Sequence, residues 1–199
     1  GVAIGGATAN TYVLGDADVG AQISVRVTYT DGGGTAEGPL TSVPTAAVAN
    51  INDAPVGLPA VIGTPTEDQT LTANTSGISD ADGLGAFSYQ WLRGGVAIGG
   101  ATANTYTLGD ADVGAQISVR VTYTDGHGTA EGPLTSVPTA AVANVNDAPV
   151  GIPTITGTPT EDQTLTANTA GISDADGLGA FSYQWLRGGV AIGGATANT

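Results

Sequence analysis

Apolar and polar residues alternate along several short segments of the chain, as they do in β-strands that bury one face. In the clearest case, residues 116–123, Ile117, Val119, Val121 and Tyr123 alternate with Gln116, Ser118, Arg120 and Thr122. Successive side chains of a strand point to opposite faces, so we expect the first set to face a core and the second set to face water. The pattern therefore predicts a central strand.

Six further segments of the same stretch predict strands. They are residues 59–62, 69–74, 87–92, 96–98, 105–108 and 134–142. Glycine pairs at 94–95 and 99–100 mark the turns of a hairpin, and Pro138 suits an edge strand. No long segment shows the 3.6-residue period of an amphipathic helix. These features predict an all-β protein built from antiparallel β-sandwiches.

The segment 87–92 carries three aromatic residues at alternate positions, Phe87, Tyr89 and Trp91. They fall on one face of the predicted strand. A tryptophan in the centre of such a strand is typical of the core of an immunoglobulin-like sandwich. A sugar-stacking surface is the alternative, and we expect core packing instead.

The chain repeats itself with a shift of 94 residues. Residues 1–55 recur as 95–149, and the sequence that follows Pro55 begins again at Pro149. Few positions differ between copies; Gly33, for example, corresponds to His127. We therefore divide the chain into three parts: 1–54, the later part of one repeat; 55–148, a complete repeat; and 149–199, the early part of the next.

The two partial repeats are complementary, because each holds the strands that the other lacks. Neither is expected to bury its inner faces alone, and each exposes strand edges. We expect them to complete a sandwich together. The partner is either a neighbouring identical chain, joined head to tail, or a neighbouring repeat in a longer covalent array.

Charge and composition narrow the classes of partner. The formal net charge is −14, with no lysine and four arginines, which argues against nucleic-acid binding. Such an acidic excess suits either a solvated surface or hard divalent cations. There is no cysteine, so neither disulfides nor thiolate zinc sites are possible. No apolar run approaches the roughly 20 residues of a membrane helix, and we expect no membrane insertion in this segment.

Acidic and amide residues gather at two joints between repeats, residues 50–55 and 144–149, which we call the earlier and the later joint. In a sandwich, the loop order brings these side chains to the gaps between repeats, and calcium prefers such oxygen ligands. The predicted ligands at the later joint are Glu67, Asp110, Asp112, Asn146, Asp147, Asp174 and Asp176. At the earlier joint they are Asp16, Asp18, Asn52, Asp53, Asp80 and Asp82. The alternative is that Asp and Asn only form turns.

The joint 50–55, the loop 79–83 and the corner 109–114 resemble the immunoglobulin-like, cadherin-like tandem repeats of large bacterial surface adhesins, including those of the RTX type. The resemblance covers the whole chain. It implies extracellular spacer segments at the bacterial cell surface, often stiffened by calcium, that support cell adhesion and biofilms. The glycine- and aspartate-rich nonapeptide calcium repeat of many such adhesins is not present in this sequence.

No residue pattern indicates catalysis. His127, the single histidine, lies in a glycine-flanked loop and is replaced by Gly33 in the other copy. We therefore expect a non-enzymatic structural spacer of an exported adhesin. A protomer of an extracellular filament, assembled head to tail by strand complementation, is the alternative. A carbohydrate-binding accessory module is a third, which would need aromatic residues exposed on one sheet face.

Overall fold

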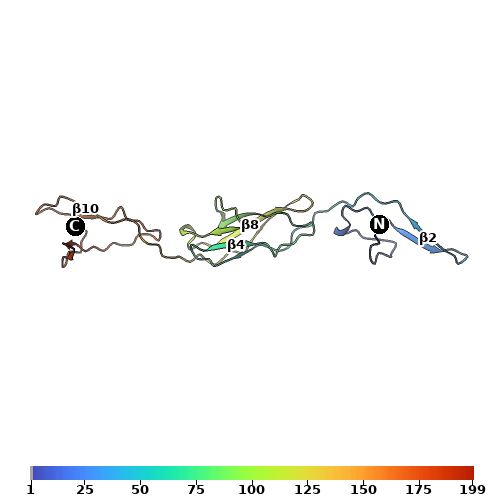
Figure 1. The fold of residues 1–199 in the computed structure, drawn as a ribbon, viewed down its shortest axis with the longest axis horizontal. Helices are drawn as coiled ribbons and strands as arrows, with labels where there is room; N and C mark the ends of the chain where they lie inside the picture. The colour runs from blue at the N-terminus through green and yellow to red at the C-terminus, as the bar shows by residue number, and fades with distance from the viewer. Residues whose placement is uncertain (1) are drawn as a thin grey trace.

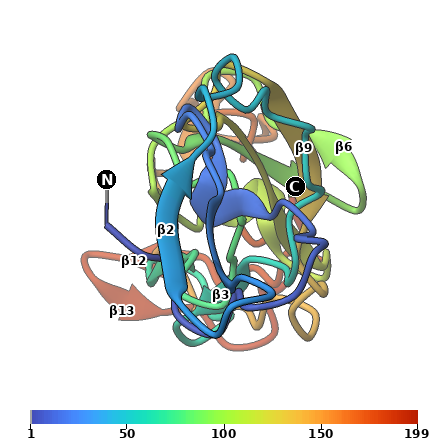
Figure 2. The ribbon, with the colours of Figure 1, turned by 90° about the vertical axis from the view of Figure 1, so that its right-hand side faces the viewer.

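A computed structural model describes residues 2–199, and in it the chain forms three units in a row. Figure 1 shows the N-terminal unit (residues 2–54), the central unit (55–148) and the C-terminal unit (149–199) along one long axis. Figure 2 looks along this axis and shows the units one behind another. Over the described residues the fold is all-β with antiparallel sheets, and its only helical elements are two short 3-10 turns, η1 (Asp16–Asp18) and η2 (Asp110–Asp112).

The central unit holds two antiparallel sheets, an arrangement that fits a β-sandwich. One sheet has three strands in the order β3 (Ala60–Ile62), β4 (Thr70–Asn74) and β7 (Thr105–Thr107). The other has four in the order β6 (Val96–Ala97), β5 (Ser88–Arg93), β8 (Ile117–Thr124) and β9 (Ala130–Thr135). Six of the seven predicted strands of this stretch match a strand here, and the seventh, 134–142, overlaps β9 only at residues 134–135.

Strand β8 is central, as its alternating pattern predicts. It pairs with β5 on one side and β9 on the other, and Ile117, Val119, Val121 and Tyr123 are buried. One detail of the prediction is wrong: Ser118, expected to face water, is also buried.

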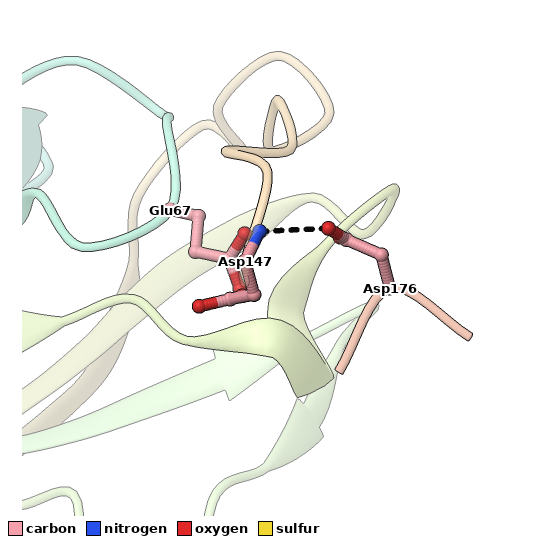
Figure 3. A group of neighbouring side chains, drawn as sticks. All are labelled: Glu67, Asp147 and Asp176. Atoms are coloured by element: carbon pink, nitrogen blue, oxygen red, sulfur yellow. Dashed lines mark hydrogen bonds between the residues drawn. The ribbon is translucent and has the colours of Figure 1, made fainter. Parts of the chain in front are cut away.

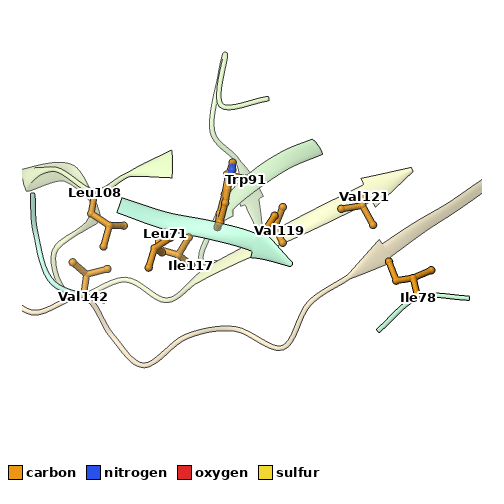
Figure 4. Packing of buried hydrophobic residues seen from close by; sticks show 9 residues of the cluster. Leu71, Ile78, Trp91, Leu108, Ile117, Val119, Val121 and Val142 are labelled. Carbon is orange, nitrogen blue, oxygen red and sulfur yellow. The ribbon is translucent and has the colours of Figure 1, made fainter. Parts of the chain in front are cut away.

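Trp91 lies at the centre of the core and is fully buried. Its ring stacks on Tyr106 with 5.8 Å between ring centroids, and its indole N–H donates to the Ala103 carbonyl oxygen at 2.9 Å. Figure 4 shows Trp91 among Leu71, Val119 and the other buried side chains. The aromatic stripe of β5 is therefore core.

The last strand differs from the prediction of 134–142. Regular pairing covers β9 only, and it ends at Thr135. Beyond Thr135 the N–H groups of Val119 and Ile117 donate to the hydroxyl oxygens of Ser136 and Thr139, at 3.0 and 3.1 Å, and not to main-chain carbonyl oxygens, so the regular ladder ends. The chain then makes single bridges, of which Thr66 to Ala143 joins it to the segment before β4. This crossing brings the exit of the central unit beside the β3–β4 loop.

The terminal units contain only two-stranded sheets. In the N-terminal unit β1 (Arg26–Thr30) pairs with β2 (Ala36–Thr41). In the C-terminal unit β10 (Thr154–Thr156) pairs with β11 (Thr166–Asn168), and β12 (Leu186–Arg187) pairs with β13 (Val190–Ala191). Within residues 2–199 no helix has the length and apolar character needed to cross a membrane.

Candidate metal centre

The later joint is held from both sides by carboxylates that accept backbone hydrogen bonds. The N–H of Val145 donates to Glu67 Oε2 at 3.0 Å, and the N–H of Asp147 donates to Asp176 Oδ2 at 2.8 Å. Glu67 belongs to the central unit, whereas Asp176 belongs to the C-terminal unit. The joint thus lies between an acid of each unit.

Glu67 is buried although it is an acid. It lies in the β3–β4 loop, 1% exposed, where its N–H donates to the Ala143 carbonyl oxygen at 2.9 Å. The next residue, Asp68, has a φ of 63°, a left-handed conformation that aspartate tolerates better than most residues. One carboxylate oxygen of Glu67, Oε1, has no hydrogen-bond partner. A buried acceptor without a partner is unfavourable, so this oxygen calls for a proton or a cation.

Three carboxylates converge at this point: Glu67, Asp147 and Asp176 (Figure 3). One oxygen of each lies within 4.8 Å of the corresponding oxygen of the other two. Calcium binds oxygens at about 2.3–2.6 Å, so two oxygens on one ion are at most about 5 Å apart. The cluster could therefore hold a metal ion, and its all-oxygen donors suit a hard divalent cation.

The electrostatics of the cluster favour an added positive charge. The hydrogen bond from Val145 acts to lower the pKa of Glu67, but contact with the Asp110 carboxyl, burial and the charge of Asp147 together raise it. The pKa of Asp147 is raised by burial and by the negative charges of Asp110, Asp176, Asp68 and Asp174. Both carboxylates thus lie in a field that disfavours their ionised form, and a cation would relieve it.

Most of the acids predicted for the later joint lie within electrostatic reach of one another. Glu67, Asp110, Asp147, Asp174 and Asp176 do so. Asp174 also supports its neighbour, because its Oδ1 accepts the N–H of Asp176 at 3.0 Å. The Asn146 side chain donates to the Asp147 carbonyl oxygen at 2.8 Å and so shapes the turn.

Asp112 has a different role from the one predicted. Its Oδ1 accepts from Arg93 Nε at 2.7 Å, and its Oδ2 accepts from the Tyr106 hydroxyl at 2.9 Å and the Gly109 N–H at 3.0 Å. Both oxygens are thus occupied inside the central unit, where Asp112 is 1% exposed. Neither Asp112 oxygen is therefore free to bind an ion at the joint.

The earlier joint contains part of the same arrangement. The N–H of Asp53 donates to Asp82 Oδ2 at 2.6 Å, as Asp147 does to Asp176. The pKa of Asp53 is raised by the charge of Asp16, by burial and by the charges of Asp82 and Asp80. Within residues 2–199, however, no group of three acids at this joint is as close as that of the later joint.

Three members of the predicted earlier set make other contacts. Asp18 accepts from the Tyr12 hydroxyl at 2.8 Å and the Gly15 N–H at 3.0 Å, as Asp112 does from their counterparts. The Asp80 carboxylate accepts a hydrogen bond from the Tyr123 hydroxyl. The Asn52 side chain donates to Glu131 Oε1 at 2.8 Å.

Two contributors to these joints were not among the predicted site residues. Asp68 follows Glu67 in the acidic loop that the sequence places at the later joint, although it was not among the predicted ligands, and it adds to the negative field at Asp147. Glu131 reaches the earlier joint from β9, and nothing in its sequence context indicates this contact.

Compared with models of protein families, with curated proteins and with solved structures, the chain shows no match.

Proposed function

We propose that this chain is a non-catalytic spacer of an exported bacterial surface adhesin, built from tandem immunoglobulin-like repeats and stiffened by calcium between the repeats. The observation that carries the proposal is the buried, unpartnered Glu67 Oε1 in a cluster of carboxylates contributed by two successive units. A site of this kind has a mechanical consequence, because an ion bound there holds both units.

Calcium would act on the joint by reversing the sign of the interaction between the units. Without a cation, Glu67 and Asp147 of one unit repel Asp176 of the next. With a cation, all three attract the same charge, and the angle between the units is fixed. Glu67, Asp147 and Asp176 are the proposed ligands, with Asp110 beside them.

The arrangement of the central unit supports the immunoglobulin-like part of the proposal. Antiparallel sheets of three and four strands and a buried tryptophan in β5 are what such a sandwich contains. The rod of units in Figure 1 suits a spacer, whose task is to hold other parts at a distance.

The alternative of a filament protomer, assembled head to tail by strand complementation, stays a prediction. No arrangement of side chains favours the carbohydrate-binding alternative. In the central unit Phe87, Tyr89 and Trp91 belong to the core or pack against it. The exposed Tyr29 and Phe181 are counterparts of Tyr123 and Phe87, so they mark an open core and not a sugar platform.

Thermal unfolding in calcium and in chelator tests the calcium proposal. A ligand at 100 times its dissociation constant stabilises the folded state by about 2.7 kcal/mol, which for a unit of this size raises the melting temperature by roughly 10 °C or more. Glu67→Gln should remove most of this rise. Glu37→Gln is the matched control, since it deletes the same charge on the exposed β2 strand of the N-terminal unit. An equal calcium response in all three proteins, or none in the wild type, would refute the site.

A further inference from the structure

The short turn η2 carries two aspartates that face in different directions beside the later joint. Asp110, its first residue, lies against the Glu67 carboxylate, and its negative charge also acts on Asp147. Asp112, its last residue, is 1% exposed and is bonded inside the central unit. Asp110 is therefore placed to give an oxygen to an ion at the cluster, whereas Asp112 is not.

The Asp112 side chain determines the conformation of this turn. Its Oδ2 accepts the N–H of Gly109 at 3.0 Å and so closes the turn onto the residue before Asp110. The same bond recurs in η1, where Asp18 Oδ2 accepts the Gly15 N–H, also at 3.0 Å. The two glycines share one backbone conformation, with φ of −140° and −135°. The aspartate at the end of the turn thus fixes the direction in which the first residue points.

Two residues of the central unit hold the Asp112 carboxylate in place. The Tyr106 hydroxyl donates to Oδ2 at 2.9 Å, and Arg93 Nε donates to Oδ1 at 2.7 Å. Tyr106 in turn stacks on the buried ring of Trp91. A charge-assisted bond and a rigid ring therefore restrict the carboxylate to one position. We call Arg93, Tyr106 and Asp112 the support network.

Main-chain hydrogen bonds join the η2 corner to the two segments beside it at the joint. The Asp68 N–H donates to the Leu108 carbonyl oxygen at 3.1 Å, in the loop that also carries Glu67. The Gly114 N–H donates to the Val142 carbonyl oxygen at 2.9 Å, in the segment that leaves the central unit. Figure 4 shows Leu108 and Val142 at the same end of the core. A shift of the corner would therefore move its acid relative to both segments.

We propose that Asp112 is a positioning residue of the calcium site: held by Arg93 and Tyr106, it sets the η2 turn so that Asp110 faces the ion as a fourth carboxylate ligand. The inference rests on the proposed calcium function. Its physical basis is preorganisation, because a ligand that is already in place loses less conformational freedom when the ion binds. Removing a group that orients a metal ligand from behind typically weakens metal binding about 10- to 100-fold.

A network that only stabilises the fold would also be buried and hydrogen-bonded, so the test must separate the two roles. They differ in what they predict for the ion. If Asp112 acts through Asp110, disturbing the support network changes calcium affinity only while Asp110 is present. If the network is only structural, the effect of disturbing it does not depend on Asp110.

A double-mutant cycle, measured by calcium titration calorimetry of the 199-residue chain, makes this distinction. Tyr106→Phe removes the hydroxyl bond to Asp112 but keeps the ring on Trp91. We expect it to weaken calcium binding about tenfold, the lower end of the range for such groups. Asp110→Ala should also weaken binding, and adding Tyr106→Phe to it should cause little further loss. The matched control is Tyr89→Phe, which removes a hydroxyl from β5 outside the support network and should bind as the wild type does.

Glu67→Gln identifies the signal that belongs to the later joint. The part of the calcium titration that this variant removes is the part compared between the other variants. All titrations are run well below the melting temperature of each variant in chelator, so that the folded chain is the species that binds.

Terbium luminescence gives a readout that a change in stability does not move. Terbium replaces calcium at oxygen sites, and its lifetimes in light and heavy water give the number of water molecules bound to the ion. Tyr106→Phe should add about one water, because a displaced Asp110 leaves a coordination position that water fills. Asp110→Ala should add the same water, and the double variant should add no more.

The outcomes separate this inference from the proposed function. A loss of about tenfold that disappears in the Asp110→Ala background, together with the added water, supports the positioning role. Wild-type affinity in Tyr106→Phe, or the same loss with and without Asp110, would overturn it while leaving the calcium site intact. A wild-type chain that binds neither calcium nor terbium would refute both.

Discussion

The central unit and the two terminal units share almost the same sequence but differ in how much of it they bury. Val119 is fully buried, whereas its counterpart Val25 is 56% exposed. The hairpins are nonetheless alike, since β1–β2 and β8–β9 pair in the same register. Hairpins therefore depend on local sequence, and the core depends on the meeting of two halves of a repeat. The unit of stability is the complete repeat.

The largest expected effect comes from removing the two tryptophans one at a time. Trp91→Ala should destabilise the central unit by about 3–5 kcal/mol, because it deletes the largest side chain of a closed core. Trp185→Ala should leave the unfolding of the central unit unchanged, because Trp185 lies in a unit whose core is open. Denaturant unfolding followed by circular dichroism measures both. Equal losses from the two variants would show that the units are not independent.

A smaller difference in unfolding free energy is expected between substitutions of the buried Asp112 and of its counterpart Asp18. Asp112→Asn should cost about 1–3 kcal/mol, because the Asp112 carboxylate joins the partly exposed Arg93 to Tyr106 and the Gly109 N–H. Asp18→Asn should have little effect on the unfolding of a monomeric chain, since Asp18 has no arginine partner there. Urea denaturation at low protein concentration compares the two. A larger loss from Asp18→Asn than from Asp112→Asn would contradict the account.

The smallest expected effect is on the pH dependence of folding stability, which should have opposite signs in chelator and in calcium. The raised pKa values of Glu67 and Asp147 mean that the folded joint holds protons which the unfolded chain releases. In chelator, stability should therefore fall as pH rises from the usual carboxylate range through the raised values. In calcium it should rise over the same window, because the ion binds the ionised carboxylates.

Melting temperatures measured across this pH window in both buffers reveal the reversal. Glu67→Gln serves as the control and should flatten both curves. Asp125 does not affect this window. Burial opposes its ionisation, but hydrogen bonds from the N–H groups of Thr129 and His127 lower its pKa overall. Its contribution to folding stability is therefore lost only at lower pH. Parallel curves in chelator and calcium would argue against an ion at the joint.

Much of the central unit was predictable because its strands carry their own signal. The alternation of 116–123 and the aromatic stripe of 87–92 gave β8 and β5 within one or two residues. The end of the last strand was not predictable in this way. The crossing to Thr66 depends on the opposite sheet, which no local pattern describes.

The candidate site was predictable as a region and less so as a set of side chains. The loop order of a sandwich is enough to bring Glu67, Asp147 and Asp176 to one gap. The loop order does not show which acids face the gap. Asp110 lies beside Glu67 at the gap, whereas Asp112, only two residues later, pairs with Arg93 inside the central unit. The burial of Glu67 Oε1 also depends on the crossing of the exit segment, which the sequence does not show.

Small-angle X-ray scattering of the chain in calcium and in chelator tests the central claim most directly. If calcium holds the later joint through Glu67, Asp147 and Asp176, the central and C-terminal units should keep one fixed angle in calcium. In chelator, or with Glu67→Gln added, the angle between these two units should spread broadly. Identical scattering in calcium and chelator would contradict the account.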